Sequence, residues 1–362
     1  SCGKVTDSKR ELGTDDIERI VSEFESELRK DLSKDSIDGS ISAAIVRGNK
    51  VIWSKAFGYA DRENKVLADT TTIYRAGSIS KSFTAFLMMK LVEDGTIKLT
   101  DAVELYFPEV KKLSGYSDST RITFLQLASH TSGLCREPQL EDADAGSIDD
   151  WEKKLIASIP TCYFVGHPGS RYEYSNIGFA ILGLALSKAT GKPFVQLMED
   201  EIFVPLKMRH SFYVIPEDLT TKLALGMEGG PSEIIDTESP KAEHNGRGYK
   251  VPNGGIYTTP NDLAKFMICN LGYNSILTKE SLELMQTEKG PLPNKYGLGF
   301  MIFHNDQISV VGHNGKVLGY TSQFAFEKKS KYGVILMRNY AWGATDLDKA
   351  SFVLSSKLRK LE

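Results

Sequence analysis

Hydrophobic residues at helical spacing mark the first regular element of the chain. Their intervals of three and four residues predict an amphipathic helix over 15–31, whose apolar stripe must pack against another part of the protein. Two runs rich in β-branched and aromatic residues follow at 41–46 and 51–57. The Gly48-Asn49 pair between these runs predicts a tight hairpin.

The middle of the chain has mainly helical patterns. Residues 78–93 carry apolar side chains on one face, and an apolar helix begins at Ile177 and is stopped by Gly191. Helices and long loops continue to about residue 290. The stretch 229–248 is polar and contains Gly and Pro, which favours a surface loop over a domain linker because helical pattern resumes soon after it.

The C-terminal part returns to β-type patterns. A last helix is expected to begin at Thr345, with Asp348 as its capping partner. Strands at both ends of the chain, separated by a long helical stretch, imply one antiparallel sheet built from both ends, with helices on its faces. The predicted class is α/β of the α+β type. The expected C-terminal strands are 298–303, 308–311, 321–326 and 333–337.

This order of elements predicts one catalytic unit made of two subdomains. Residues 14–98 and 293–362 are expected to form the sheet subdomain, and residues 99–292 a mainly helical one. The site is expected between them. Residues 1–13 are polar and lack apolar periodicity, so they are expected to form a flexible tether.

Composition and charge exclude several classes of protein for this chain. Apolar residues make up 41% of the 362 residues and charged residues 25%, which is typical of a globular protein and not of a disordered or collagenous one. The 44 Lys and Arg are interleaved with 47 Asp and Glu, so no basic stripe favours nucleic acid. The longest apolar stretch, 179–186, is far shorter than the roughly 20 residues that cross a bilayer.

The cysteines leave two questions open. Four cysteines, at scattered positions, are too few for a disulfide framework or a C-x-x-C metal site. Cys269 lies in an apolar helical pattern and is expected to be a buried thiol. Cys135 and Cys162 form a disulfide only if the fold brings them together. Cys2 is either the lipidated residue of a bacterial lipoprotein at the periplasm or cell surface, or an ordinary cysteine beside an artificial chain start.

Ser78 and Lys81 are the first candidates for chemistry. They lie three residues apart at the start of a predicted helix, so the hydroxyl and the amine can touch. A desolvated amine can take the proton of a serine nucleophile, and the N–H groups at a helix N-terminus can stabilise an oxyanion. The alternative is an exposed first turn with Ser78 as helix cap.

Two further segments carry polar groups suited to a site. Tyr174 stands at a loop-to-helix corner and can relay protons if nearby cations lower its pKa, and the Asn176 amide can hold a substrate carbonyl. The alternative is a helix cap with a core aromatic. In the second segment His313 is a switchable donor, and the backbone N–H after Gly315 can complete an oxyanion pair; the alternative is an ordinary glycine turn.

These segments occur in an order that resembles a known family. Across about residues 35–340, six blocks follow one another as in the class C β-lactamase-like serine hydrolases, and six ordered blocks are far more specific than any one of them. The blocks are Arg75-Ala-Gly-Ser-Ile-Ser-Lys81, His130-Thr-Ser-Gly-Leu134, Pro168-Gly-Ser-Arg-Tyr-Glu-Tyr-Ser-Asn176, Asn253-Gly-Gly-Ile-Tyr257, Tyr296-Gly-Leu-Gly-Phe300 and Gly312-His-Asn-Gly315.

The resemblance implies the penicillin-recognising β-lactamase/DD-peptidase fold and a role for each matched residue. Ser78 would be the acylated nucleophile and Lys81 its proton partner. Tyr174 would relay protons to the leaving group and activate water, and Asn176 would orient the acyl amide. Substrate binding would further involve the stretch His313, Asn314, Gly315 and Lys316.

The last block departs from the β-lactamases of the family. His313 stands where they carry the Lys of a Lys-Thr-Gly motif, and histidine is charged only below about pH 6.5 unless perturbed. A histidine at this position is more similar to the peptidase and D-aminopeptidase branches of the family. Lys316 either restores the missing positive charge or is a solvated turn lysine.

The resemblance implies a serine hydrolase that cleaves an amide or ester through an acyl-enzyme and needs no cofactor or metal. A peptidase acting on D-amino-acid peptides or an esterase is favoured, with at most weak β-lactamase activity. The alternatives are a penicillin-binding sensor that acylates without efficient turnover, and a true class C β-lactamase. Expected partners are small-molecule or peptide substrates and acylating β-lactams.

The remaining histidines, at 130, 167, 210, 244 and 304, show no metal-ligand spacing and are expected to be structural or surface residues.

Overall fold

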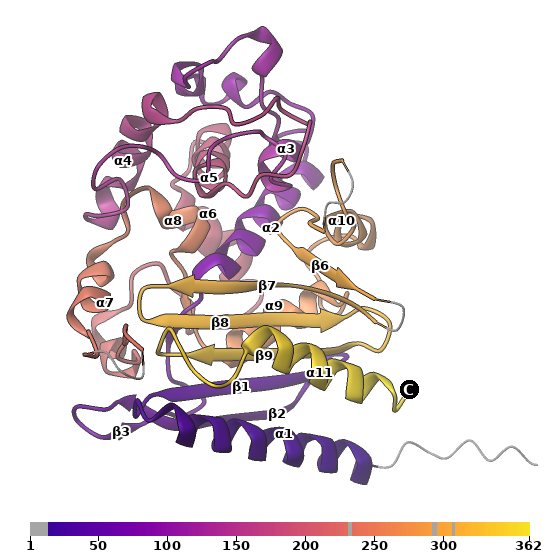
Figure 1. Ribbon diagram of the computed structural model, residues 1–362. Coiled ribbons are helices and arrows are strands. Elements are labelled where there is room, and N and C mark those ends of the chain that lie inside the picture. The colour runs from indigo at the N-terminus through magenta and orange to yellow at the C-terminus, as the bar shows by residue number, and fades with distance from the viewer. Residues whose placement is uncertain (1–13, 231–233, 292–294, 306–307) are drawn as a thin grey trace, which may run out of the picture.

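A seven-stranded antiparallel sheet forms the centre of the protein in the computed structural model (Figure 1). The model describes residues 14–230, 234–291, 295–305 and 308–362, so the expected tether and Cys2 lie outside the described residues. The strands are β1 Ser40–Arg47, β2 Lys50–Asp61, β3 Val66–Leu67, β6 Met301–His304, β7 Ser309–Val317, β8 Tyr320–Glu327 and β9 Tyr332–Arg338, in the order β3-β2-β1-β9-β8-β7-β6. The short strands β4 Tyr74–Arg75 and β5 Tyr257–Thr258 pair separately.

The sheet joins the two ends of the chain, as the sequence predicts. Strand β1 near the N-terminus pairs antiparallel with the last strand, β9. Strands β1 and β2 form the expected hairpin, and Gly48 in its turn has a φ of +56°, which glycine adopts without strain. The predicted α+β class is therefore confirmed.

Helices cover both faces of the sheet. The helices are α1 Thr14–Asp35, α2 Ser80–Glu93, α3 Phe124–Ala128, α4 Trp151–Ser158, α5 Asn176–Thr190, α6 Phe194–Met198, α7 Glu238–Ala242, α8 Val251–Gly254, α9 Pro260–Asn270, α10 Lys279–Met285 and α11 Leu347–Arg359. On one face, α1 and α11 pack on Ile41 and Ile45 of β1, whereas Ala44 and Val46 face the larger core shared with α2. Both faces of β1 are thus buried.

Helix α2 lies in the core between the sheet and the helices α3 to α6 (Figure 1). The sequence predicts one apolar face for it, but every residue from Ser80 to Met89 is buried. Its polar side chains bond to neighbouring backbone: Ser82 donates to the Gly299 carbonyl and Thr84 to the Pro252 carbonyl. Because these hydrogen bonds satisfy the buried hydroxyls, the helix is held on all sides.

The boundaries of three predicted elements were wrong at the C-terminal end. Strand β6 begins only at Met301, because Gly299 has a φ of +76° and turns the chain against α2. Strand β7 was expected to end at residue 311 but continues to Val317, through the segment for which an ordinary glycine turn was the alternative. Helix α11 is capped by Asp346, whose carboxylate accepts from the Lys349 N–H, and not by Thr345.

The predicted surface loop at 229–248 is more ordered than its composition suggests. It contains helix α7 and a 3₁₀ turn, Glu243–Asn245, although residues 231–233 within it lie outside the described residues. Pro240 in α7 is buried against Gly226 and Gly319, so this segment packs on the sheet side of the protein.

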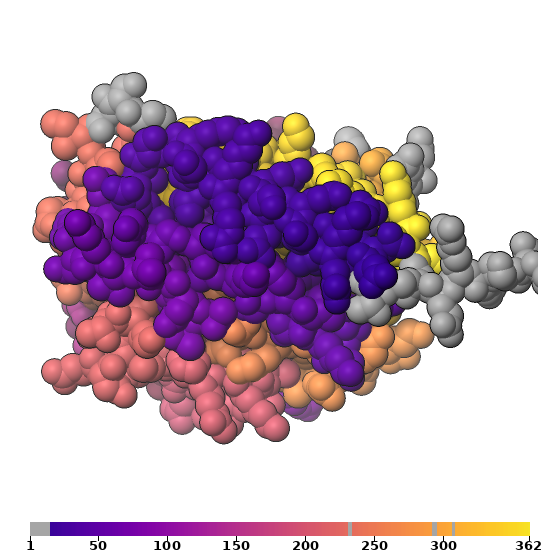
Figure 2. Space-filling view, turned by 90° about the horizontal axis from the view of Figure 1, so that it is seen from below, coloured from indigo at the N-terminus to yellow at the C-terminus, as the bar shows by residue number. Residues whose placement is uncertain are grey.

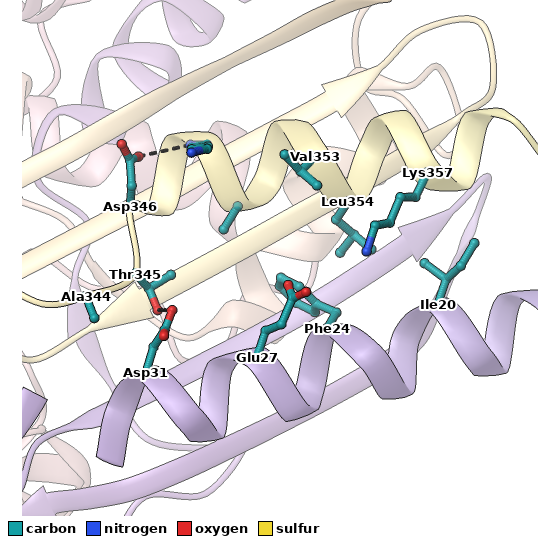
Figure 3. Close-up of a pocket in the computed structure, with 12 residues that line it drawn as sticks. Ile20, Phe24, Glu27, Asp31, Ala344, Thr345, Asp346, Val353, Leu354 and Lys357 are labelled. Atoms are coloured by element: carbon teal, nitrogen blue, oxygen red, sulfur yellow. Dashed lines mark hydrogen bonds between the residues drawn. The ribbon is translucent and has the colours of Figure 1, made fainter. Parts of the chain in front are cut away.

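Helices α1 and α11 lie side by side, so the two ends of the described chain share one layer (Figure 2). Thr345 donates to Asp31 across this layer. A groove of about 340 Å³ runs between the two helices, with Phe24 at its apolar floor and the charged residues Glu27, Asp31 and Lys357 around it (Figure 3). None of its lining residues belongs to the segments that carry Ser78, Tyr174 or His313.

Within the described residues, none of the helices combines the length and apolarity that crossing a bilayer requires. Cys135, Cys162 and Cys269 are all free and buried, so no disulfide joins Cys135 to Cys162 in this structure. The expectation that Cys269 is a buried thiol is confirmed.

Candidate active site

Ser78 lies in a 3₁₀ turn, Gly77–Ile79, that leads directly into α2. Gly77 has a φ of +55°, and a Cβ atom there would lie 2.9 Å from the backbone nitrogen of Lys316. Glycine is therefore required both by the conformation and by the close approach of β7. The result is a half-buried serine between strand β7 and helix α2.

Lys81 lies one turn further along and is completely buried. Its Nζ is 3.0 Å from Ser78 Oγ and donates to the Asn253 carbonyl, also at 3.0 Å. Burial holds the pKa of Lys81 well below its usual 10.5, although the Glu137 carboxylate acts in the opposite direction. The amine is thus suited to accept a proton from Ser78.

Tyr174 completes a three-residue contact around the serine. Its hydroxyl donates to Ser78 Oγ at 3.0 Å from a position 96 residues away in sequence. Burial raises the pKa of Tyr174 to about 12 even though the Arg136 guanidinium lies 4.7 Å from the ring centroid. The lowered pKa that would favour proton relay is absent, and Tyr174 stays a neutral phenol near pH 7.

His130 packs against the Tyr174 segment and is hydrogen-bonded to it. It is fully buried, its ring lies 4.2 Å from the Tyr174 ring between centroids, and its Nδ1 accepts from the Ser175 N–H at 3.0 Å. Burial keeps its pKa well below 6.5, so the ring is neutral. Ser175 in turn caps α5 by accepting from the Gly178 N–H. The expectation that His130 is structural therefore agrees with its position. It also contacts Tyr174, which belongs to the candidate site.

The β7 residues divide between two faces of the sheet, as alternate residues of a strand do. Gly315 packs on the Ala76 carbonyl beside the serine turn, whereas the Asn314 side chain donates to Asp348 on α11. The Lys316 ammonium lies 4.2 Å from the Trp342 ring centroid, and its backbone nitrogen lies against Gly77. The structure therefore brings Gly315 and the Lys316 backbone to Ser78, but not the Asn314 side chain.

His313 is buried and has both ring nitrogens in hydrogen bonds. Nδ1 lies 2.6 Å from the Asn314 carbonyl, to which it can only donate, and Nε2 lies 2.9 Å from the Tyr296 hydroxyl, from which it therefore accepts. Burial lowers the pKa of His313 to about 3. At neutral pH this histidine provides no positive charge.

Asn176 begins α5 next to the three-residue contact. Its amide nitrogen Nδ2 donates to Glu137 at 2.5 Å, and its backbone carbonyl accepts from Asn253, the residue whose own carbonyl binds Lys81. The described residues contain no cluster of three or more His, Cys, Asp or Glu arranged to hold a metal ion. The chemistry available to these residues is proton transfer and nucleophilic attack by an oxygen.

Residues 30–354 match the family model described as Beta-lactamase. This chain belongs to the beta-lactamase family. The resemblance found in the sequence is thereby confirmed. Members of this family are usually serine hydrolases, and the Ser78 geometry is what such a mechanism requires.

Solved and curated relatives agree with this family. The octameric penicillin-binding protein homologue from Pyrococcus abyssi superimposes with a TM-score of 0.77 at 25% identity, covering 94% of this chain and 77% of that chain. Protein flp of Staphylococcus aureus (strain MW2) is 29% identical over 321 residues, which are 86% of this chain and 61% of the relative. Beta-lactamase-like protein 4 of Dictyostelium discoideum is 30% identical over 331 residues, which are 83% of this chain and 57% of the relative. The chain thus spans about three fifths of the length of these curated relatives.

The close packing of Gly315 gives a test of how this beta-lactamase family site is built. In Gly315→Ala the new Cβ would lie 2.0 Å from the Ala76 carbonyl oxygen, so β7 must move away from Ser78. We expect a loss of about 1–3 kcal/mol in the free energy of unfolding and at least a tenfold loss of activity. Urea unfolding and ester hydrolysis measure the two effects. The matched control is Gly95→Ala, where nothing lies within 4 Å, so it should lose stability through its positive φ but keep its activity.

Proposed function

We propose that this protein is a serine hydrolase that cleaves an amide or ester through an acyl-enzyme on Ser78. The observation that carries the proposal is the convergence of a buried amine and a phenol on one hydroxyl, each 3.0 Å from Ser78 Oγ. A structural relative without activity would not need to bury the Lys81 amine beside that hydroxyl, because burial of an amine costs stability.

Acylation begins with proton transfer from Ser78 to Lys81. The serine hydroxyl gives its proton to the neutral form of Nζ, which burial favours, while Oγ attacks the substrate carbonyl. The backbone N–H of Ser78, near the free N-terminal end of its helical turn, and that of Lys316 are the donors available to the oxyanion. This assigns to Lys316 a role through its backbone and not through its ammonium, which lies over Trp342.

Tyr174 then transfers the proton to the leaving group. A phenol that donates to Ser78 Oγ can pass its own proton to the departing nitrogen or oxygen and take another from Lys81, whose Nζ lies 4.9 Å from the ring centroid. In the second half of the reaction the same groups position and deprotonate water. Because Tyr174 has a pKa of about 12, it acts by exchanging protons and is not a phenolate in the resting enzyme.

The neutral His313 supports a peptidase or esterase over an efficient β-lactamase. Burial and the nearby Lys81 lower its pKa to about 3, which leaves no positive charge where the β-lactamases of the family carry a lysine. A D-amino-acid peptide or a small ester is therefore the favoured substrate. The second candidate is a sensor that is acylated by β-lactams and releases them slowly, because a missing cation affects turnover and not only binding.

A substrate panel tests this proposal. The protein is incubated with p-nitrophenyl esters, D-aminoacyl amides and a chromogenic cephalosporin, and the intact mass is followed together with product release. Steady turnover of esters or D-aminoacyl amides above that of the cephalosporin supports the hydrolase. A stoichiometric burst followed by no release supports the sensor, and the absence of any adduct contradicts both.

Tyr174→Phe separates proton relay from binding. Phenylalanine keeps the ring against His130 but removes the hydroxyl that donates to Ser78. We expect kcat to fall about 100- to 1,000-fold while KM changes less than about threefold. Steady-state kinetics on one ester measure both values, and Tyr172→Phe, which removes a neighbouring hydroxyl, should leave kcat near the wild-type value. Equal losses in the two variants would mean that the Tyr174 hydroxyl has no special role.

A further inference from the structure

Glu137 fixes the Asn176 side chain from outside the serine contact. One carboxylate oxygen accepts from Asn176 Nδ2 at 2.5 Å, and the other accepts from the Tyr249 hydroxyl. Lys250 Nζ lies 3.6 Å from the second oxygen, and the Arg136 Nε lies 3.9 Å from the first. Glu137 is thus held in place by groups on two segments, and its charge is balanced by two neighbouring cations.

The backbone of Asn176 is held as firmly as its side chain. Its N–H donates to the Arg136 carbonyl at 2.9 Å, and its carbonyl accepts from Asn253 Nδ2 at 2.8 Å. With both backbone groups engaged, the remaining freedom of Asn176 is the direction of its terminal amide.

A carboxylate decides this direction, because it can only accept hydrogen bonds. The NH₂ end of Asn176 must therefore face Glu137, and the opposite orientation would put the amide oxygen against a carboxylate oxygen. The amide oxygen Oδ1 has no partner among the described residues and is not buried. Asn176, two residues after the Tyr174 that contacts Ser78, consequently offers a free acceptor and not a free donor.

We propose that Glu137 is a specificity-determining residue, which orients Asn176 so that the site selects acyl groups carrying an N–H donor next to the reacting carbonyl. This inference rests on the proposed function and names its substrate class. The donor is either an amide N–H or a protonated amine, and both have the same hydrogen-bonding chemistry. The sequence suggested the reverse, an Asn176 amide that holds a substrate carbonyl.

Glycine-based methyl esters test the inference without a choice of stereochemistry. The methyl ester of N-acetylglycine presents an amide N–H and that of glycine an ammonium, whereas those of N-acetylsarcosine and acetoxyacetic acid present no N–H. Acid release is followed by titration, and each kcat/KM is divided by the rate of the same ester with hydroxide. In the wild type we expect the donor esters to exceed the esters without a donor by about tenfold.

Glu137→Ala allows the Asn176 amide to rotate so that either end can face the substrate. The ratio of kcat/KM between esters with and without a donor is therefore expected to fall to threefold or less. The ratio is insensitive to any shared change in the basicity of Lys81, since both kinds of ester depend on the same amine. Glu141→Ala, an exposed glutamate in the same segment, is the matched control and should keep the tenfold ratio. If Glu137→Ala does not fold, Glu137→Gln replaces it, because a glutamine amide can face Asn176 with either end and should lower the ratio as well.

The outcomes separate this inference from the proposed function. A wild-type ratio within threefold, or a full ratio in a folded Glu137 variant, overturns the role of Glu137 while hydrolysis stands. A complete absence of turnover and of a Ser78 adduct with all four of these esters, and with the p-nitrophenyl esters and D-aminoacyl amides of the substrate panel, overturns the proposed function itself. A preference for the N-acetylglycine ester over the glycine ester identifies an amide as the donor, and the reverse preference identifies an ammonium; both support the inference.

Discussion

Ser78→Ala is expected to abolish both the covalent adduct and turnover. Without the hydroxyl the remaining amine and phenol have no nucleophile to activate, so hydrolysis should fall by at least about 10⁴-fold, towards the rate of the site without covalent catalysis. Intact-mass analysis after incubation with an activated ester should show no added acyl group. The free energy of unfolding should change little, because Ser78 is half-buried and the substitution removes one atom.

Ser80→Ala is the control for this variant. Ser80 lies two residues away and its buried hydroxyl accepts from the Ile256 N–H at 3.2 Å, so its loss should cost stability and leave the adduct intact. An adduct that persists in Ser78→Ala would move the nucleophile elsewhere. An adduct lost equally in Ser80→Ala would indicate that the turn was disrupted and not that a specific oxygen was removed.

The part of the site that the sequence could predict is the part made by neighbouring residues. Ser78 and Lys81 are one helical turn apart, and this spacing alone brings the amine to the hydroxyl. Tyr174 lies 96 residues from Ser78 and no local pattern connects them. Only the ordered family blocks linked the two, because the blocks carry information about a shared fold.

Charge states at the site could not be predicted in the same way. Tyr174 was expected to have a lowered pKa if cations were near, and a cation is indeed near, yet burial raises the pKa to about 12. His313 was expected to titrate near neutral pH, but burial and the nearby Lys81 lower its pKa to about 3, although the hydrogen bond to the Asn314 carbonyl acts in the opposite direction. Burial depends on how distant segments pack, and sequence spacing does not report it.

Glu137 was missed because it looks like an ordinary solvated residue. It lies in a polar stretch, and 38% of its side chain is still exposed. The only signal was its place three residues after the His130–Leu134 block, in a segment whose backbone pairs with α5 through Asn176. The sheet, by contrast, was predictable, since both faces of β1 and β9 are buried and their sequences are mainly apolar.

Lys81→Met is expected to have opposite effects on activity and on stability. Methionine has a similar length and fills the same buried space, but it cannot accept a proton from Ser78. We expect kcat/KM to fall about 1,000-fold or more. In the wild type, kcat/KM should also fall as the pH is lowered through the depressed pKa of Lys81, because the protonated amine is no base. This acid limb should be absent from the residual activity of Lys81→Met.

The same pKa shift predicts the effect on stability. The folded protein holds Lys81 with a pKa well below 10.5, so between the two pKa values the unfolded chain binds one more proton, and the free energy of unfolding rises with pH in that range. At pH 7 the wild type therefore carries a penalty for the buried amine that Lys81→Met removes. Urea unfolding from pH 7 to pH 10 should show a higher midpoint for Lys81→Met at pH 7 and a difference that narrows as the pH rises. A variant less stable at pH 7 would mean that the hydrogen bond from Lys81 to the Asn253 carbonyl outweighs the desolvation of the amine, and the amine would then be a structural group and not a base held ready for Ser78.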